Sequence, residues 1–221
     1  MVCDNRGMTS TENASLTTDQ TARVVLIRHG QTDWNFEHRF QGQVDIPLNE
    51  TGREQAGEAA ENLLAFAAAE QENQPDFRWD AVLTSPLSRA FQTGEIIAHA
   101  LGLEVSKTYD GMQERSFGEA EGVVVTPEIW GDLEARFNGI EPLEDLRERG
   151  IAALNVALSE HRGKNVIIVA HGLWIAQVME ELTGEDMVLP VNGAITELPL
   201  ELLEHRSTDF SSTESPSSQA I

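Results

Sequence analysis

Two histidines stand directly after apolar runs in this sequence. His29 follows residues 24–28 (VVLIR) and His171 follows residues 166–170 (VIIVA), and a glycine comes directly after each histidine. An imidazole nitrogen can attack phosphorus, and a glycine beside it lets other groups approach the ring closely. The repeated pattern indicates two histidines that act at one place.

Arg28 and Arg89 are the cations that accompany this pair. Arg28 directly precedes His29, and Arg89 follows a third apolar run within the segment SPLSRA. A guanidinium binds two phosphoryl oxygens at once, so these residue types suit phosphoryl transfer to an imidazole. A strand followed by His-Gly is more often only a turn. The coincidence of all these features is what favours a catalytic site.

The elements that would position these residues follow from the alternation of patterns along the chain. Apolar β-branched runs predict strands, and apolar residues at helical spacing predict helices. Their alternation favours an α/β fold, a three-layer α/β/α sandwich with a mostly parallel central sheet. Both histidines and Arg89 would then emerge at the carboxyl edge, where such sheets bind ligands. The predicted strands cover residues 23–27, 79–84, 103–107, 165–169 and, at an edge, 194–198, and the predicted helices cover residues 51–70, 86–101, 127–137, 142–160 and 172–182.

Two helix starts are predicted from capping signals. Ser85 followed by Pro86 is typical of an N-cap and a first-turn proline, which would place Arg89 in the first turn of its helix. Residues 51–54 (TGRE) have the spacing of a capping box. A helix N-terminus favours anions, so the first prediction strengthens the proposed anion site. Residues 108–125 are predicted to form a loop.

The charge balance narrows the class of partner. The 221 residues include 37 acidic and 15 basic side chains, which gives a net charge of −22. Such a surface repels nucleic acid and anionic membranes, so neither is an expected partner. The expected partner is a small phosphorylated metabolite. The oligomeric state is left open.

One domain of ordinary hydrophobicity is predicted. It spans residues 21–204, between flexible Ser/Thr-rich tails at residues 1–20 and 205–221. The single cysteine, Cys3, excludes an intramolecular disulfide. A secretory signal and a membrane-spanning run are both missing from the pattern, so a cytoplasmic protein is expected.

Residues 26–35 (LIRHGQTDWN) resemble the signature of the histidine phosphatase superfamily, which includes the cofactor-dependent phosphoglycerate mutases. The resemblance runs in order over about residues 23–198 and implies a phosphoglycerate mutase-like fold. Its further motifs lie at residues 39–42, 45–48, 51–52, 85–90, 114–118, 121–122, 171–172 and 192–193.

The resemblance also implies roles for individual residues. His29 would become phosphohistidine, and Glu114 would protonate the leaving oxygen and then activate water. From the residues alone Glu114 has rivals, because Glu119 and Glu121 lie nearby. The residues expected to form the phosphate pocket around His29 are Arg28, Arg89 and His171. The expected substrate-binding residues are Asn35, Gln41, Gly42 and Gly172.

No metal or other cofactor is expected. His29, His38 and His171, with Asp33 nearby, are conceivable metal ligands by residue type. The two arginines that flank the site would oppose binding of a cation. A metal-independent reaction is therefore the prediction.

Water is the expected acceptor of the phosphoryl group. In the mutases, a lysine and a pair of arginines after the acid-carrying loop bind a second anionic group. In this chain, the segment from residue 122 has no basic residue until Arg136. This favours a phosphatase. Two alternatives stay open: a cofactor-dependent phosphoglycerate mutase and a catalytically silent protein that binds phosphorylated ligands.

Two departures from the usual phosphatase pattern concern the substrate. Residues 141–145 (EPLED) stand where the family often has Gly-Glu-Ser, and Gln43 stands where a tryptophan often follows Gln-Gly. The triplet 41–43 is similar to that of actinobacterial-type relatives that act on phosphorylated sugar–glycerate compounds. The identity of the substrate stays open.

Overall fold

The computed structural model describes residues 22–202, which form a five-stranded sheet in the order β3-β2-β4-β1-β5. The first four strands in the sequence are mutually parallel, and β5 runs antiparallel to β1 at one edge. This confirms the predicted α/β class and the mostly parallel sheet. The strands are β1 (Val24–Arg28), β2 (Ala81–Thr84), β3 (Val105–Thr108), β4 (Val166–Ala170) and β5 (Ile195–Glu197).

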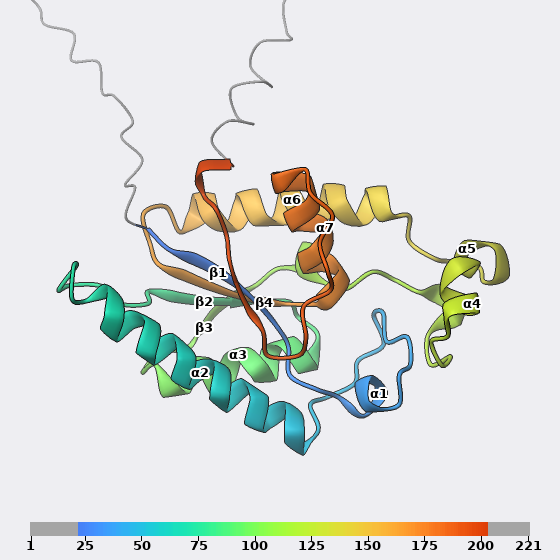
Figure 1. Ribbon diagram of the computed structural model, residues 1–221, viewed down its shortest axis with the longest axis horizontal. Coiled ribbons are helices and arrows are strands. Elements are labelled where there is room, and N and C mark those ends of the chain that lie inside the picture. Colours follow the sequence, from blue (N-terminus) through green and yellow to red (C-terminus); the bar gives the residue numbers. More distant parts are fainter. Residues whose placement is uncertain (1–21, 203–221) are drawn as a thin grey trace, which may run out of the picture.

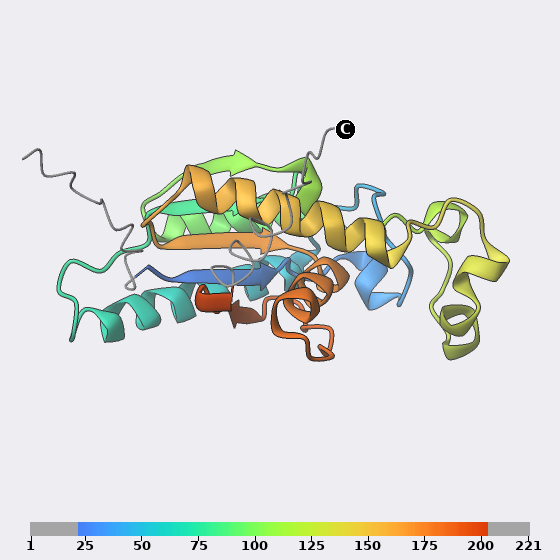
Figure 2. The same cartoon turned by 90° about the horizontal axis from the view of Figure 1, so that it is seen from above.

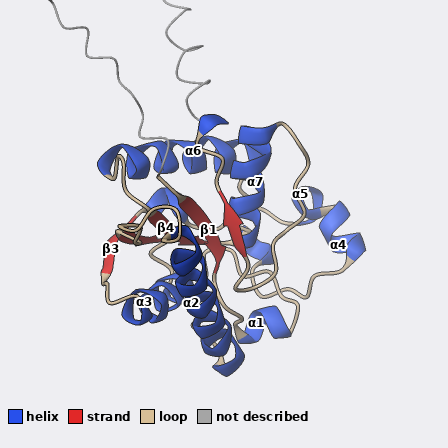
Figure 3. Cartoon of the chain, turned by 60° about the vertical axis from the view of Figure 1, so that its left-hand side comes forward, coloured by secondary structure: helices blue, strands red, loops and turns tan. Residues whose placement is uncertain are grey.

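Helices cover both faces of the sheet. Helices α2 (Glu50–Glu70) and α3 (Ser88–Ala100) lie on one face, and α6 (Leu143–Glu160) and α7 (Gly172–Thr183) lie on the other (Figure 1). Figure 3 shows the same three layers from another side. The three-layer prediction is confirmed.

The alternation of side chains along β1 explains why two helical layers form. Val25 and Ile27 pack with α2 and α3, while Val24 and Leu26 pack with α6 and α7. Successive side chains of a strand point to opposite faces, so a wholly apolar strand needs a cover on each side. The continuous apolar runs noted above meet this condition.

A small lobe, which we call the cap and define as residues 113–141, stands beyond the sheet (Figures 1 and 2). It has its own small core of Phe117, Ala120 and Leu133, which Phe40 completes. The predicted helix at 127–137 is in fact two short helices. The predicted loop at 108–125 contains two short 3₁₀ helices. The short elements are α1 (Asp33–Phe36), η1 (Asp110–Met112), η2 (Gly118–Ala120), α4 (Pro127–Gly131) and α5 (Leu133–Arg136).

Strand register brings the chemistry-bearing residues together. Arg28 pairs with Ala170 across β1 and β4, and Thr84 pairs with Val169 across β2 and β4. The hydrogen bonding continues one residue further, because the amide of His29 donates to Ala170 O at 3.0 Å. The ends of these three strands therefore lie side by side.

The two predicted helix caps are wrong. Helix α3 begins at Ser88 after Leu87, which makes no side-chain cap, and its first amide donates instead to Asp45 Oδ1 at 2.7 Å. Ser85 lies three residues before this helix start, where its hydroxyl accepts from Leu87 N at 3.3 Å and lies 2.8 Å from His171 Nε2. Helix α2 begins one residue before the predicted capping box, with Asn49 as its N-cap. Arg89 still lies in the first turn of its helix.

Several predictions concern parts of the chain outside residues 22–202. The two tails, at residues 1–20 and 205–221, and Cys3 lie there, so the domain boundaries stay a prediction. Within the described part of the chain, the longest apolar helices fall short of what a bilayer crossing needs.

Candidate active site

His29 lies buried at the end of β1, with 3% of its surface exposed. Its Nδ1 lies 2.7 Å from Gly30 O, and its Nε2 accepts a hydrogen bond of 3.2 Å from Arg89 Nε. A carbonyl oxygen only accepts, so Nδ1 must carry the proton and Nε2 the lone pair. Nε2 is therefore the nitrogen that is available for attack.

Arg89 is fully buried and reaches three groups in this pocket. Besides His29, its guanidinium donates to Val44 O at 3.0 Å and to Gly42 O at 2.7 Å. These bonds attach residues 41–44, which we call the substrate-side loop after the role predicted for Gln41 and Gly42, to His29. A guanidinium has five N–H donors, so two remain for a ligand.

His171 lies next to His29 with ring centroids 5.1 Å apart. Its Nε2 faces the Ser85 hydroxyl at 2.8 Å, and among the described residues no group bonds its buried Nδ1. Arg28 leaves its buried Nε without a partner in the same part of the chain, while its Nη1 donates to Pro190 O at 2.7 Å. Arg28 Nε and His171 Nδ1 are thus two buried nitrogens that the oxygens of a bound phosphoryl group could satisfy.

Gly172 makes room for Arg28 behind this pocket. A Cβ at Gly172 would lie 3.2 Å from Arg28 Nε. This contact is tighter than ordinary packing, so a side chain at this position would press on the guanidinium. The prediction that Gly172 belongs to the site thus has a steric basis, although the residue contributes no side chain.

The electrostatic environment disfavours protonation of both imidazoles. Burial, and then the positive charges of Arg89 and Arg28, hold the pKa of His29 well below its usual value. Burial and the same arginines lower the pKa of His171. Burial also lowers the pKa of Arg89, to about 10, against an opposing effect of Glu114. A neutral imidazole is the form that attacks phosphorus.

Glu114 lies against the start of α7, directly beyond the second histidine. Its carboxylate accepts the amides of Leu173 at 3.1 Å and Trp174 at 3.0 Å, and that of Arg115 at 3.0 Å. Burial lowers the pKa of Arg28 and of Arg89, and the negative charge of Glu114 opposes that effect at both guanidiniums. The helix N-terminus provides a natural place for a carboxylate.

The rival carboxylates lie elsewhere. Glu119 accepts hydrogen bonds from Asn138 within the cap. Glu121 accepts the amides of Gln43 at 2.9 Å and Phe117 at 3.2 Å, and thereby joins the substrate-side loop to the cap. Of the three acidic residues, Glu114 alone contacts the turn that follows His171.

The predicted substrate-side residues share one hydrogen-bond network with Thr32. Asn35 Oδ1 accepts from the Thr32 amide at 3.1 Å and from Asn192 Nδ2 at 3.3 Å, and Gln41 Oε1 accepts from the Thr32 hydroxyl at 2.8 Å. The oxygen of each amide is thus occupied, and the NH₂ groups of Asn35 and Gln41 stay available to donate to a ligand. Asn192 also donates to His29 O at 2.9 Å.

Gly42 follows Gln41 in a left-handed conformation, with φ of 54°. A Cβ there would also lie 2.0 Å from Glu121 Oε1, which could move away only by releasing its bonds to Gln43 N and Phe117 N, so the backbone conformation is what requires glycine. The predicted site residues are therefore joined by hydrogen bonds and close contacts into one cluster. Their individual roles stay predictions.

Comparison with known proteins identifies the family. Residues 24–213 match the model of the histidine phosphatase superfamily, branch 1. The chain belongs to this superfamily. The family prediction made from the motifs is confirmed.

Three relatives of the superfamily illustrate its range. The chain is 35% identical over 191 residues to the uncharacterized phosphatase PhoE of Bacillus subtilis, covering 85% of this chain and 93% of that one. It is 34% identical over 172 residues to phosphoglycerate mutase-like protein 4 of Arabidopsis thaliana, covering 72% and 70%. A solved structure of a mycobacterial glucosyl-3-phosphoglycerate phosphatase with VO3 matches with a TM-score of 0.63, 28% identity and coverage of 80% and 92%. These matches confirm the predicted enzyme class, a phosphatase of the histidine phosphatase superfamily.

Sequence reasoning missed two groups that support the site of this histidine phosphatase. The Ser85 hydroxyl orients His171, and the Thr93 hydroxyl accepts from Gly30 N at 3.0 Å and donates to Arg89 O at 2.8 Å. Ser85 directly follows β2, so its place beside the two strand-end histidines is a signal that was available. Thr93 carries no such signal, because it lies within a helix.

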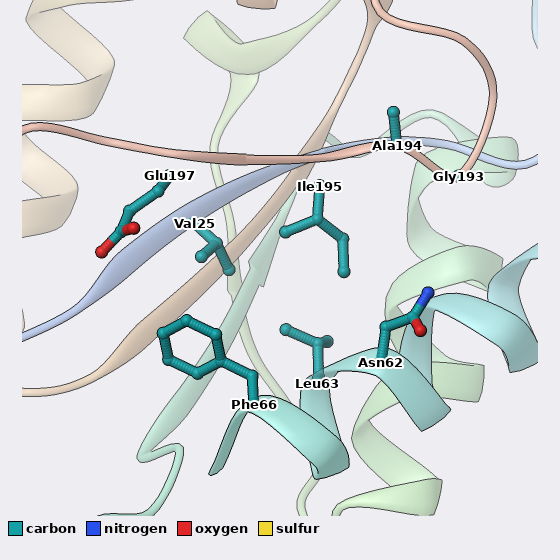
Figure 4. Close-up of a pocket in the computed structure, with 8 residues that line it drawn as sticks. All are labelled: Val25, Asn62, Leu63, Phe66, Gly193, Ala194, Ile195 and Glu197. Carbon is teal, nitrogen blue, oxygen red and sulfur yellow. The ribbon is translucent and has the colours of Figure 1, made fainter. Parts of the chain in front are cut away.

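A hollow of about 450 Å³ lies away from this pocket, between α2 and β5. Figure 4 shows Phe66 and Leu63 of α2 facing Val25 and Ile195 of the sheet across it.

Among residues 22–202, no group of three or more His, Cys, Asp or Glu side chains has the arrangement of a metal site. Metal independence stays a prediction that a chelator tests.

Proposed function

We propose that this protein is a metal-independent phosphomonoester hydrolase that works through a phosphohistidine at His29. The observation that carries the proposal is the geometry of that ring. The bond from Nδ1 to Gly30 O fixes the tautomer, and Nε2 faces a pocket whose free donors come from Arg28, Arg89 and His171. A nucleophile and a set of donors for three equatorial oxygens are the parts that phosphoryl transfer needs.

The reaction has two steps in this proposal. Glu114 enters the first step protonated: His29 Nε2 attacks phosphorus, the P–N bond forms, the P–O bond to the alcohol breaks, and Glu114 gives the alcohol its proton. In the second step water attacks phosphorus, the P–N bond breaks, Glu114 takes up the proton of that water and so returns to its starting form, and phosphate leaves. The two arginines neutralise charge on the phosphoryl oxygens in both steps.

The cations of the cap support hydrolysis over isomerisation. Arg115 is paired with Glu134 at 2.6 Å, and Arg136 is paired with Asp132 at 3.1 Å. A mutase must hold a second anionic group of its substrate, and the buried guanidinium of Arg115 serves this poorly because it also donates to Glu141 O at 2.6 Å. We therefore propose that water, and not the product alcohol, receives the phosphoryl group.

The proposed substrate is a small phosphorylated metabolite in the cytoplasm. The likeness of the triplet 41–43 to sugar–glycerate phosphatases, together with the mycobacterial relative named for glucosyl-3-phosphoglycerate, makes sugar–glycerate monoesters the first to test. 3-Phosphoglycerate belongs in the same screen because one relative is named mutase-like. Isomerisation of 3-phosphoglycerate without net release of phosphate would favour the mutase alternative.

The proposal is tested by phosphate release from p-nitrophenyl phosphate at acidic to neutral pH. The wild type should turn over with and without EDTA, and His29→Ala should lose activity while its Tm shows that it is folded. Wild-type protein without activity on any monoester would refute the hydrolase and favour a silent binding protein. Loss of activity in EDTA would refute the metal-free mechanism.

A further inference from the structure

Arg149 of α6 is bonded to the loop that carries the proposed acid, Glu114. Its Nη1 donates to Gly111 O at 3.0 Å and to Gln113 O at 2.8 Å, and its Nη2 donates to Glu114 O at 2.9 Å. One guanidinium thus holds three carbonyls within four residues of chain. Such a rigid planar fork fixes the backbone more firmly than separate side chains would.

Glu141 completes this arrangement from the far end of the cap. It pairs with Arg149 through two bonds, Nε to Oε1 at 2.6 Å and Nη2 to Oε2 at 2.9 Å. Its Oε2 also accepts the amide of Ser116 at 3.0 Å. The ion pair is therefore hydrogen-bonded to the backbone on both sides of Glu114.

Both members of the pair are charged and partly sheltered from water. Side-chain exposure is 24% for Arg149 and 14% for Glu141. Burial raises the pKa of Glu141, but the hydrogen bonds from Arg149 and from Ser116 N outweigh it and the pKa is lowered. A bidentate, partly buried pair of this kind fixes the relative geometry of its two side chains.

This pair and α7 together fix the position of Glu114, and Gln43 Nε2 adds a hydrogen bond of 3.3 Å to Glu114 O. The pair fixes the backbone of the loop, and the amides of Leu173 and Trp174 bind the carboxylate. Arg149 also lies close enough to the pocket that its charge contributes to the lowered pKa of His171, after burial and the nearer cations. The pair is thus connected to the reacting groups through Glu114.

We infer that Arg149 and Glu141 are positioning residues that aim the carboxyl group of Glu114 at the leaving oxygen. This inference rests on the proposed function, in which Glu114 is the general acid. Residue 141 also stands at the start of the segment that departs from the usual Gly-Glu-Ser. In this chain its carboxylate binds Arg149 and the amide of Ser116.

A positioning role and a merely structural role differ in how they depend on the leaving group. A phenolate such as p-nitrophenolate leaves with little protonation, whereas an alkoxide needs the acid. Misplacing Glu114 should therefore slow an alkyl monoester more than an aryl one. A weakened fold would slow both in the same proportion.

The experiment compares kcat/KM for p-nitrophenyl phosphate and for glycerol 2-phosphate in Arg149→Met. The ratio of the aryl to the alkyl value should rise by at least about tenfold, because general acid catalysis contributes 10²–10⁴-fold. Arg147→Met is the matched control on the same helix, since Arg147 bonds Gln177 and Glu144 and not the loop. Its ratio should stay at the wild-type value.

Milder variants cover the case in which Arg149→Met does not fold. Arg149→Lys keeps the charge without the fork, and Glu141→Gln keeps an acceptor for Ser116 without the ion pair. Each should change the ratio in the same direction by a smaller factor. A ratio unchanged in both of these folded variants would overturn the inference.

A double variant separates action through Glu114 from an independent effect. In a Glu114→Gln background, Arg149→Met should change alkyl kcat/KM by less than about threefold, because the group it positions is gone. Full additivity would overturn the inference. If the wild type hydrolyses neither ester, the proposed function fails; if it hydrolyses both through His29 and the ratio does not move, only the inference fails.

Discussion

Replacing Arg89 with methionine should remove several interactions of the pocket at once. The guanidinium bonds His29 Nε2, Gly42 O and Val44 O, and two further N–H groups remain for phosphoryl oxygens. Loss of one preorganised donor to a developing charge costs about 10²–10³-fold in kcat. With two donors lost and the substrate-side loop released, we expect kcat/KM for p-nitrophenyl phosphate to fall by about 10³-fold or more.

The same variant should shift the pH profile in a defined direction. After burial, the charge of Arg89 is the main cause of the lowered pKa of His29. Without that charge the pKa of His29 rises, so the imidazole becomes protonated, and unable to attack, at a higher pH. The acid limb of kcat/KM should therefore move to higher pH.

The assay is the pH dependence of p-nitrophenyl phosphate hydrolysis for wild type, Arg89→Met and Arg89→Lys. Lysine keeps the charge without the planar fork. The acid limb of Arg89→Lys should therefore stay near its wild-type pH, while its kcat/KM should still fall. Arg53→Met, an exposed arginine on α2, is the control and should match the wild type. An Arg89→Met rate within tenfold of wild type, or an acid limb that moves to lower pH, would refute the reasoning.

Two further substitutions test the support of the site. Gly30→Ala should destabilise the fold by about 1–3 kcal/mol in urea unfolding, because overpacking costs that much and the new Cβ would lie 2.1 Å from Gly52 O. Gly57→Ala on α2 is its control: a Cβ there meets nothing within 4 Å, so stability should be unchanged or rise by about 0.5–1 kcal/mol. Equal stability of the two variants would contradict the packing argument. Ser85→Ala should lower kcat about threefold to tenfold by removing one neutral hydrogen bond to His171; an unchanged kcat would show that the ring is oriented without it.

The sequence alone indicated that His29, His171 and Arg89 lie together at one edge of the sheet. Residues 24–27 and 166–169 are apolar without interruption, which only a strand covered on both faces explains well. Parallel strands joined by helices end at one edge, so His29 and His171 had to meet there. The same local rules located Arg89, even though the predicted cap of its helix was wrong.

Only the tertiary structure decided where Glu114 lies and what fixes it. Its segment has neither helical nor strand periodicity, so sequence spacing did not separate it from Glu119 and Glu121. Its place depends on contacts with α6 and α7, 35 and 59 residues away in the chain. The Ser85 hydroxyl is a similar case, because its bond with His171 Nε2 joins residues 86 positions apart, which local capping signals do not encode. Periodicity encodes which face of an element is buried, whereas contacts between loops depend on distances that the assembled fold alone sets.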